Sequence, residues 1–383
     1  MPKRIGFIYD IMCDKDFIRK TIINGTILKR GRKDVQEVLR NLDYYVDLMY
    51  DILINHRYIP SIPIISLFYD KSSEKTRKIG SQPYFPDGLA NQLAVEAVRE
   101  RMTKGFHYYS CASIPDRGGK RMLKYSKYFI QEKPKSSRYV AELDIKQFYP
   151  SVPLKSLIKA LRRKYKDETY LQFIALLITC DQRGQKYFYD NHISAEEIVG
   201  DKVGLIIGFF INQWLSNFYL SPVDRLILSF KSVKFECRYA DNINIAGPNK
   251  KKLHKVLRAI TEKLCTLGLK LKENWQLYKA DARMLSTVGY RIGRDCVIMR
   301  KRNFLRFARQ CRRALKHLRD GKAISFKMTV SLMSRIGQLK HCDSFHFKQK
   351  YVYPIGIGRL RKIIRTYAKR QNDLQYMSLH GGF

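Results

Sequence analysis

Apolar residues return at regular spacing along several stretches of the chain, and each stretch predicts one element. Between Asp34 and His56 they recur every three or four positions, which predicts one amphipathic helix that packs on a core. Those apolar positions are Val35, Val38, Leu39, Leu42, Val46, Met49 and Leu53. From Tyr58 to Gly119 the periodicity is lost and Pro, Gly and Ser become frequent, so this part is predicted to be irregular.

Shorter patterns predict strands in the middle of the chain. The run YVAELDI (residues 139–145) predicts a buried strand that ends next to an acidic residue. The segment KFECRYADNINIAG (residues 234–247) alternates on both sides of a polar centre, which predicts a hairpin with Asp241 and Asn242 near its tip. Two later patterns, LGLKL and TVGYRI, predict further short strands.

Helices are predicted between these strands. Helical spacing of apolar residues covers residues 154–161, 171–179 and 253–264. Strands mixed with helices in this order predict an α+β fold, in which an antiparallel sheet carries helices on one face.

The last part of the chain is strongly basic. Residues 301–383 contain 20 Lys and Arg against three Asp and no Glu. Two stripes at helical spacing predict a helix with one packing face and one basic face. The packing stripe is Phe304, Phe307, Cys311, Leu315 and Leu318, and the basic stripe is Arg306, Arg309, Arg313 and Lys316. Because no Glu is interleaved, we expect the basic face to meet phosphates.

The charge of the whole chain points to the same kind of partner. Lys and Arg number 73 against 34 Asp and Glu, which gives the 383 residues a formal net charge of +39. Such a surface is typical of proteins that bind nucleic acid, because phosphate contacts release counterions. A charge kept for solubility rarely reaches this size, and no isolated basic amphipathic arm indicates binding to a membrane surface.

Neither a membrane span nor a disulfide framework is expected. The most apolar stretch, GLIIGFFINQWLSNFYL, is interrupted by Asn212, Gln213 and Asn217. The eight cysteines form no C-x-x-C pair, which predicts reduced thiols in a cytoplasmic protein. The N-terminal segment becomes acidic too early for a signal peptide.

Two aspartates stand where a sheet can bring them together. Asp144 lies at the end of the first predicted strand, and Asp241 lies at the tip of the predicted hairpin. Phosphoryl transfer to a 3′-hydroxyl uses two divalent ions roughly 4 Å apart, held by carboxylate oxygens. Magnesium prefers oxygen ligands and keeps several waters, so a pair of aspartates at strand ends suffices. A single aspartate at a strand end is more often a turn former, but the pair is more specific.

Four segments around these aspartates resemble the catalytic blocks of reverse transcriptases. They are AELDIKQFYPSV, GLIIGFFINQWLSNFYLSPVDRLI, RYADNINIAG and LGLKLKENWQLYKADARMLSTVGYRI. The resemblance implies a right-hand polymerase with fingers over residues 1–137, a palm over 138–295 and a basic helical thumb over 296–383. It also implies RNA-directed DNA synthesis from deoxynucleotides on RNA and DNA, with two Mg²⁺ ions as cofactors and Mn²⁺ able to substitute.

The resemblance further implies roles for individual residues. Asp144 and Asp241 are the expected metal ligands, with Asn242 as a further catalytic position. Tyr149 is expected under the incoming sugar, where its ring excludes a ribose 2′-hydroxyl. Further substrate-binding positions are Gln147, Phe148, Gln213, Lys75 and Arg77, of which the last two belong to a block whose cations grip the triphosphate. Nucleic-acid contacts are implied for Gly208, Gly289, Tyr290, Lys120 and Arg121, in addition to the basic stripe.

The chain departs from the family pattern at two places. Asn242 stands where the family has a second hairpin aspartate, and a neutral amide is expected to hold a metal more weakly. Phe209, Phe210 and Ile211 replace the small and hydroxyl residues usual beside the template, which predicts unusual templating.

A narrower resemblance rests on a Gln in place of Pro, on NWQ after LGLKLKE and on SRIGQLKHCDS. These features resemble reverse transcriptases of diversity-generating retroelements and the related defence-associated enzymes of bacteria, which implies a bacterial or phage-encoded protein. We expect a DNA polymerase in antiviral defence, with an accessory protein or second polymerase subunit as partner. The alternatives are a mutagenic enzyme of a diversity-generating retroelement and a scaffold that has lost catalysis. RNA maturation without polymerisation is a weaker alternative, because no maturase-like extension is recognised.

Overall fold

Strands from separate parts of the chain form one sheet, which carries the candidate aspartates. The order of its strands is β4 (Phe235–Tyr239), β5 (Asn242–Gly247), β3 (Tyr139–Asp144) and β6 (Gln276–Lys279). The structure, a computed structural model, describes residues 4–70, 75–183 and 185–380, with no side chains described at 75, 185, 187 and 370–380. Contacts divide the chain into a first unit, Met1–Met122 with Tyr139–Leu277, and a second unit, Leu123–Arg138 with Tyr278–Phe383. The three ranges expected for fingers, palm and thumb stay a prediction.

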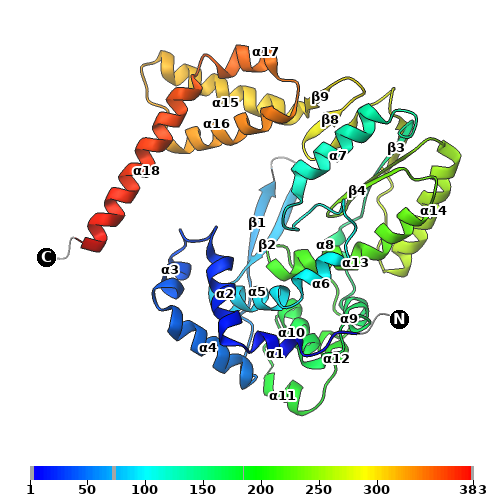
Figure 1. The fold of residues 1–383 in the computed structure, drawn as a ribbon, viewed down its shortest axis with the longest axis vertical. Coiled ribbons are helices and arrows are strands. Elements are labelled where there is room, and N and C mark those ends of the chain that lie inside the picture. Colours follow the sequence, from blue (N-terminus) through cyan, green and yellow to red (C-terminus); the bar gives the residue numbers. More distant parts are fainter. Residues whose placement is uncertain (1–3, 71–74, 184, 381–383) are drawn as a thin grey trace. The chain divides into compact units, whose positions relative to one another are not determined.

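The first unit combines the sheet with many helices and one further hairpin (Figure 1). Its strands are β1 (Ile64–Asp70), β2 (Lys75–Ser81), β3 (Tyr139–Asp144), β4 (Phe235–Tyr239), β5 (Asn242–Gly247) and β6 (Gln276–Lys279), the last of which runs into the second unit. Its helices are α1 (Ile8–Met12), α2 (Lys15–Thr26), α3 (Lys33–Arg40), α4 (Leu42–Ile54), η1 (Tyr84–Gly88), α5 (Leu89–Glu96), α6 (Arg99–Lys104), α8 (Phe148–Ser151), α9 (Leu154–Arg162), α10 (Glu168–Thr179), α11 (Gln185–Asp190), α12 (Ala195–Val199), α13 (Phe210–Ser229) and α14 (Lys250–Thr266). Helix α7 (Gly118–Glu132) begins in this unit and ends in the second.

The sheet is antiparallel where its register is defined, and helices cover its apolar face. Strands β3 and β4 both pair antiparallel with β5, as the strand and hairpin patterns predicted. Ile243 and Ile245 of β5 are fully buried, and α13 and α14 pack on this part of the sheet. The predicted stripe from Leu253 to Leu264 is the buried face of α14, whose N-terminus is capped by the Asn249 side chain.

The segment from Asp34 to His56 forms two helices, so the prediction of a single helix is wrong. Helices α3 and α4 meet at Asn41, whose φ of −114° and ψ of 46° are not helical. Both helices contact α2, and α3 contacts η1 as well. The apolar spacing continues across the break because both helices bury the same stripe.

The segment from Tyr58 to Gly119 is also more regular than predicted. Strands β1 and β2 pair as an antiparallel hairpin, and α5 follows with nearly every side chain buried. A helix buried on all sides has no amphipathic period to recognise. The LGLKL pattern, in contrast, makes only one isolated bridge, between Leu271 and Ile145.

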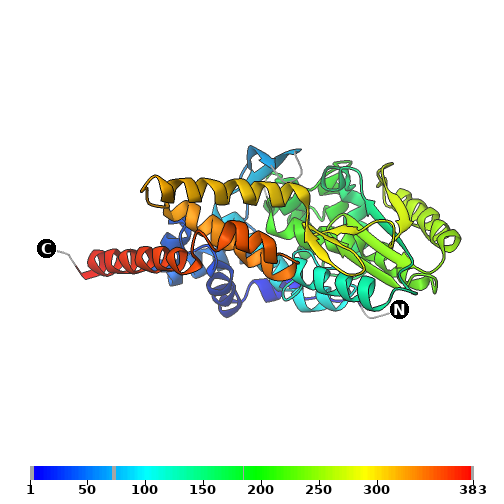
Figure 2. The same cartoon turned by 90° about the horizontal axis from the view of Figure 1, so that it is seen from above.

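The second unit is a small sheet with a bundle of helices (Figure 2). Its elements are β7 (Leu285–Thr287), β8 (Tyr290–Ile292), β9 (Val297–Met299), α15 (Lys301–Arg319), α16 (Phe326–Gln338), η2 (Leu339–His341), α17 (Phe345–Phe347), η3 (Lys348–Val352) and α18 (Ile357–His380). The TVGYRI pattern spans the β7–β8 turn rather than one strand, and both turn residues, Val288 and Gly289, have positive φ. Arg294 donates to the Ile130 carbonyl (2.6 Å) and to the Ser137 hydroxyl (2.8 Å), which ties residues 123–138 to this unit.

Helix α15 buries only part of the face that its sequence predicted, because Phe304 is 39% exposed and Leu315 and Leu318 are half-buried. Phe307 and Cys311 are fully buried in the core of the second unit, together with Ala308 and Ala314 between the predicted positions. Helices α16 and α18 pack on each other, and the rings of Phe326 and Tyr367 stack with centroids 3.7 Å apart. Among the helices of the described residues, none is long and apolar enough to cross a membrane.

Candidate active site

The two candidate aspartates lie at adjoining strand ends of the first unit. Asp144 is the last residue of β3 and pairs across the sheet with Asn242, the first residue of β5. Asn242 also pairs with Tyr239, so the β4–β5 turn consists of Ala240 and Asp241. The Ile145 amide donates to the Asp241 carbonyl (3.3 Å), which joins the turn to the end of β3. The sheet therefore brings together carboxylates 97 positions apart in the chain.

The two carboxylate oxygens of Asp144 have different surroundings. Oδ2 forms an ion pair with Nζ of Lys272, and the Lys272 amide donates to the Asp144 carbonyl (2.9 Å). Oδ1 is buried, and no donor among the described residues reaches it. Burying a carboxylate oxygen without a hydrogen-bond partner costs free energy, unless a bound ligand supplies the missing interaction.

Asp241 resists ionisation more than an ordinary aspartate. Burial raises its pKa, and the negative charge of Asp144 raises it further. Nδ2 of Asn242 donates to Oδ1 of Asp241 (3.2 Å), although Asn242 itself is exposed. A cation bound between the two side chains would offset the negative charge of Asp144 that raises the pKa of Asp241.

These residues fit a divalent cation with oxygen ligands. Asp144 offers its unpartnered Oδ1, and Asp241 offers a second carboxylate beside it. Within the described ranges no group of three or more His, Cys, Asp or Glu lies together as a metal site. Lys272 must release Oδ2 before that oxygen can bind a metal.

Tyr149 lies near this pair, on α8. Its hydroxyl lies 3.3 Å from Oγ of Ser216 on α13, and its ring meets the ring of Phe148 edge to face. Burial raises the pKa of Tyr149, and the charges of Asp241 and Arg77 both act on it. The structure thus brings Arg77 of β2, Tyr149 and Asp241 within electrostatic reach of one another.

The other predicted substrate residues divide into accessible and buried positions. Gln147 is exposed and has a φ of +44°, and Gln213 is half-buried in the first turn of α13. Phe148 is only 2% exposed and belongs to the core, so its side chain does not line a substrate site as predicted. Lys75 begins β2, but its side chain lies outside the described part of the structure.

The loop before α13 is shaped by backbone packing. Gly208 has a φ of +118°, and a β-carbon there would collide with the Gly80 carbonyl of β2. The Gly80 amide donates to the Ile207 carbonyl (2.8 Å), so this loop lies directly on the β1–β2 hairpin. Phe209 and Ile211 are buried in the core, which corrects the expectation that they lie beside a template.

The basic residues Lys120, Arg121 and Arg77 of the first unit differ in exposure. Lys120 is exposed at the start of α7, whereas Arg121 is half-buried. The Arg121 guanidinium lies over the Tyr108 ring, 4.4 Å from its centroid. Arg77 has its Nε 3.7 Å from Oδ2 of Asp70, across the β1–β2 hairpin.

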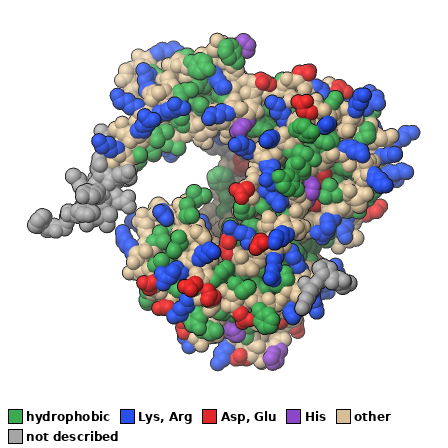
Figure 3. All heavy atoms as spheres, viewed as in Figure 1, with side chains coloured by type: hydrophobic (Ala, Val, Ile, Leu, Met, Phe, Trp, Pro, Cys, Tyr) green, Lys and Arg blue, Asp and Glu red, His purple; other side chains and the backbone are tan. Residues whose placement is uncertain are grey.

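In the second unit, the basic stripe of α15 is accessible but Tyr290 is not. Arg309, Arg313 and Lys316 are exposed and Arg306 is half-buried, and Figure 3 shows Lys and Arg side chains over the C-terminal helices. Tyr290 is 8% exposed and its hydroxyl donates to the Gln338 carbonyl (2.9 Å). Its ring and hydroxyl therefore hold α16, which corrects the prediction of a direct nucleic-acid contact. Gly289 serves the β7–β8 turn.

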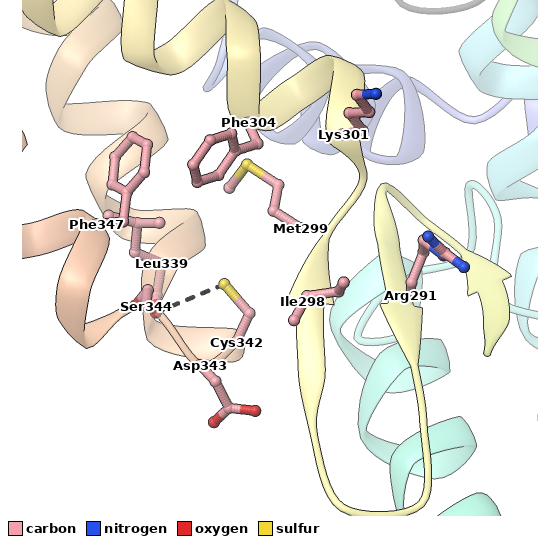
Figure 4. A pocket seen from close by; sticks show the side chains of 10 residues that line it. All are labelled: Arg291, Ile298, Met299, Lys301, Phe304, Leu339, Cys342, Asp343, Ser344 and Phe347. Carbon is pink, nitrogen blue, oxygen red and sulfur yellow. Dashed lines mark hydrogen bonds between the residues drawn. The ribbon is translucent and has the colours of Figure 1, made fainter.

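The second unit also contains a cavity of about 290 Å³ that holds none of the predicted catalytic residues (Figure 4). It is lined by Arg291, Ile298, Met299, Lys301, Phe304, Leu339, Cys342, Asp343, Ser344 and Phe347. Its apolar side chains come from β9, α15, η2 and α17. The Val297 amide donates to Oδ2 of Asp343 (2.8 Å), so this carboxylate is engaged by the backbone.

Sequence reasoning missed two groups next to the aspartates. One is Lys272, whose ion pair with Asp144 depends on the bridge at Leu271. The other is a buried ion pair between Arg238 of β4 and Asp224 of α13 (2.7 Å). The only sequence signal for the second group is an arginine inside an otherwise buried strand.

A buried carboxylate, Glu236, precedes Arg238 by two residues on β4. Burial raises its pKa to about 7, and the charge of Asp224 adds to this shift, whereas His107 and Arg238 oppose it. Oε2 of Glu236 forms an ion pair with Nδ1 of His107 when that ring is protonated. A carboxyl with a raised pKa stabilises the fold most while neutral, and this stabilisation is lost as pH rises through about 7.

We therefore expect Glu236→Gln to become more stable relative to the wild type as pH rises from 5 to 8. The amide carries no charge to bury, and each 1 kcal/mol gained shifts the melting temperature of a chain of this size by about 1–2 °C. Thermal melting of both proteins across this pH range measures the effect. A melting difference that does not change with pH would contradict the assignment of a titrating Glu236.

The fold and the paired carboxylates define a right-hand polymerase of α+β type, as the sequence predicted. The chain belongs to the reverse transcriptase (RNA-dependent DNA polymerase) family, whose pattern matches residues 70–281, more than half of its length. Members of this family bind RNA, DNA and nucleotides and use divalent metal ions.

The chain is only distantly similar to solved structures, and no curated protein sequence matches it. Apo telomerase from Candida tropicalis is similar at 14% identity and a TM-score of 0.40, over 85% of this chain and 67% of that chain. The same enzyme truncated from its C-terminal domain is similar at 14% identity and a TM-score of 0.38, over 62% of this chain and 55% of that chain. The chain thus spans 55% of the length of the truncated telomerase.

Proposed function

We propose that this chain is an RNA-directed DNA polymerase that adds deoxynucleotides by two-metal nucleotidyl transfer at Asp144 and Asp241. The observation that carries the proposal is the meeting of two carboxylates at the β3 and β5 ends, one with an unpartnered buried oxygen. Two Mg²⁺ ions, with Mn²⁺ as a substitute, supply activation of the 3′-hydroxyl and charge compensation at the phosphoryl group. Incorporation of labelled deoxynucleotides on a primed RNA template tests the proposal.

The chain's own residues then have separate tasks. Asp144 and Asp241 would hold the cations, and Oδ2 of Asp144 would be available as a ligand only without its ion pair to Lys272. Arg77 brings positive charge to the same place for the triphosphate, with Lys75 expected beside it. The ring of Tyr149 occupies the volume that a ribose 2′-hydroxyl needs, and its contact with Ser216 keeps the ring in place.

A catalytically weakened scaffold is the second candidate. It is favoured by the ion pair of Lys272 with Asp144, which neutralises one carboxylate, and by the missing charge at Asn242. In that case the chain binds nucleic acid for an active partner subunit. Absence of nucleotide incorporation in Mg²⁺ and in Mn²⁺, with nucleic-acid binding retained, would support the scaffold.

We place the activity in bacterial antiviral defence, in the cytoplasm, with the diversity-generating role as the alternative. Asn242 and the half-buried Phe210 are the departures from the family pattern that support this role, because Phe209 and Ile211 are core residues. An accessory protein or second polymerase subunit belongs to the same proposal. Sequencing the DNA made on a defined RNA separates the two roles, because a diversity-generating enzyme is expected to misincorporate opposite adenines.

We also propose that the exposed basic stripe of α15 binds nucleic-acid phosphates. Replacing Arg309, Arg313 and Lys316 with Gln is expected to weaken binding to duplex DNA and to reduce the salt slope by about 0.9 for each phosphate that the variant no longer neutralises. Binding measured over a range of salt concentrations gives that slope. The matched control replaces three exposed lysines of α14, Lys251, Lys252 and Lys255, with Gln. Equal weakening in both triple variants would show that only net charge matters.

Asn242→Asp is expected to lower the Mg²⁺ concentration needed for half-maximal synthesis by roughly tenfold, the factor that corresponds to about 1.4 kcal/mol. The new carboxylate stands directly opposite Asp144 and beside Asp241, so it repels both until a cation binds. In the wild type, Mn²⁺ is expected to support synthesis better than Mg²⁺, because its affinity for a given site is higher.

Metal titration of nucleotide incorporation measures both effects. Asn249→Asp is the control, because it adds the same charge at the N-cap of α14, where aspartate also caps a helix. If the wild type already works fully in low Mg²⁺, Asn242 is not beside a metal.

A further inference from the structure

The guanidinium of Arg238 is a buried charge that makes several hydrogen bonds within the first unit. Arg238 and Asp224 are each 1% exposed, and they form a two-pronged ion pair in which Nε and Nη2 donate to the two carboxylate oxygens, both at 2.7 Å. The Ser110 hydroxyl donates to the same carboxylate (2.8 Å). Buried in this way, the guanidinium has a fixed orientation.

The third nitrogen of the guanidinium, Nη1, reaches the β4–β5 turn that contains Asp241. Nη1 donates to Oδ1 of Asn217 (3.0 Å) and to the carbonyl of Ala240 (3.0 Å). Nδ2 of Asn217 donates to the Ala112 carbonyl (2.8 Å), which fixes which end of the amide faces Arg238. Asn217 and Asp224 lie seven residues apart on one face of α13, so one helix holds both sides of the guanidinium.

The backbone at Ala240 requires such support. Its φ is +54°, a left-handed conformation that is unfavourable for a residue with a β-carbon. Ala240 directly precedes Asp241, so a change in its φ and ψ swings the Asp241 carboxylate away from Asp144. A hydrogen bond from a rigid buried donor to its carbonyl opposes that change.

We propose that Arg238 is a positioning residue, which holds the Ala240 carbonyl and thereby keeps the Asp241 carboxylate beside Asp144. Asp224 and Asn217 anchor its guanidinium from α13. This inference rests on the proposed function, because it concerns the same pair of carboxylates. The alternative is an ion pair that serves only the packing of α13 on β4.

A contribution to the free energy of unfolding does not by itself explain the buried ion pair of Arg238 with Asp224. A buried ion pair can often be replaced by apolar side chains of similar volume without loss of stability, because burial of both charges costs as much as their attraction gains. The bond to Ala240 is the feature that such a replacement removes. The test therefore removes both charges together rather than leaving Asp224 buried alone.

The test variant combines Arg238→Met with Asp224→Leu. A second variant, Arg238→Lys, keeps a positive charge for Asp224 but lacks the fork that reaches Asn217 and Ala240. The matched control is Ser110→Ala, which loses the hydroxyl that donates to Asp224 and accepts from Nη2 of Arg238 (3.3 Å), but keeps the guanidinium, its ion pair with Asp224 and the Nη1 bond to Ala240. Thermal melting identifies a variant that does not fold.

Three measurements follow the turn and the metal site separately. Amide hydrogen exchange of the peptide that contains residues 239–243 is expected to accelerate by about tenfold or more in both test variants, but not in the control. Binding of Mn²⁺ without nucleotide, measured by electron paramagnetic resonance, is expected to weaken by about tenfold. For synthesis, we expect kcat to fall by about 10- to 100-fold while KM for the deoxynucleotide stays within about twofold.

The outcomes separate this inference from the proposed function. If the turn exchanges at the wild-type rate in a folded test variant, Arg238 does not position it and the inference is overturned. If exchange accelerates but the wild type neither binds Mn²⁺ nor incorporates nucleotides, the proposed function fails while the role of Arg238 in the turn stands. If the Ser110→Ala control changes as much as the test variants, the network acts only through packing, which also overturns the inference.

Discussion

Replacing Asp144 with alanine is expected to reduce deoxynucleotide incorporation by roughly 1,000-fold or more while the protein stays folded. Asp144 is the carboxylate at the end of β3, and its Oδ1 is buried without a donor among the described residues. The substitution removes one proposed metal ligand and leaves Asp241 as the remaining carboxylate of the pair. The side chain is one-third exposed, so its removal creates no large cavity in the core.

Primer extension with labelled deoxynucleotides, next to thermal melting and nucleic-acid binding, measures this effect. Asp43→Ala is the matched control, because Asp43 is also an ion-paired aspartate, with Arg19, but its side chain is exposed on α4, away from the candidate site residues. Full activity of Asp144→Ala would mean that the metal site lies elsewhere. The same variant tests the proposed defence role, since bacteria that express it should lose protection against phage that the wild type provides.

Tyr149→Ala is expected to lower the preference for deoxynucleotides over ribonucleotides by about 10- to 100-fold. The Tyr149 ring is held between the Phe148 ring and the Ser216 hydroxyl, close enough to Asp241 for their charges to interact. A ring fixed there excludes a 2′-hydroxyl by volume, and alanine leaves that volume open. Deoxynucleotide incorporation should fall less than ribonucleotide incorporation rises.

Comparing kcat/KM for matched ribo- and deoxynucleotides gives the ratio. Tyr149→Phe is the matched control, because it keeps the ring and removes only the hydroxyl that faces Ser216. This control should retain most of the discrimination. A ratio that is unchanged in Tyr149→Ala, with activity preserved, would make Tyr149 an ordinary packing residue.

Local patterns predicted the parts of the fold that bury one face. Strand β3, the β4–β5 hairpin, α14 and the packing face of α15 all follow from apolar periodicity, because in each case burial on one side imposes the pattern. The same reasoning failed where burial is uniform or changes direction. Helix α5 is buried all round, and the apolar stripe of α3 and α4 runs unbroken past the bend at Asn41.

The residue roles that the family resemblance implied agreed with the structure less often than the predicted helices and strands did. The motif letters cannot show exposure, so Phe148, Phe209 and Tyr290 were expected at the substrate or nucleic acid but are core residues. Gly208 illustrates the same point, because its positive φ and its close approach to Gly80 give it a backbone role.

By itself, the sequence determined that the protein is basic, that it has an α+β core, and that one aspartate ends a strand while another lies at the tip of a hairpin. These properties depend on composition and on spacing within short segments, which the chain carries before it folds. Only the tertiary structure decided which groups surround those aspartates. Lys272 meets Asp144, and Arg238 meets Asp224 and the Ala240 carbonyl, because antiparallel pairing and helix packing bring together residues that no local period relates.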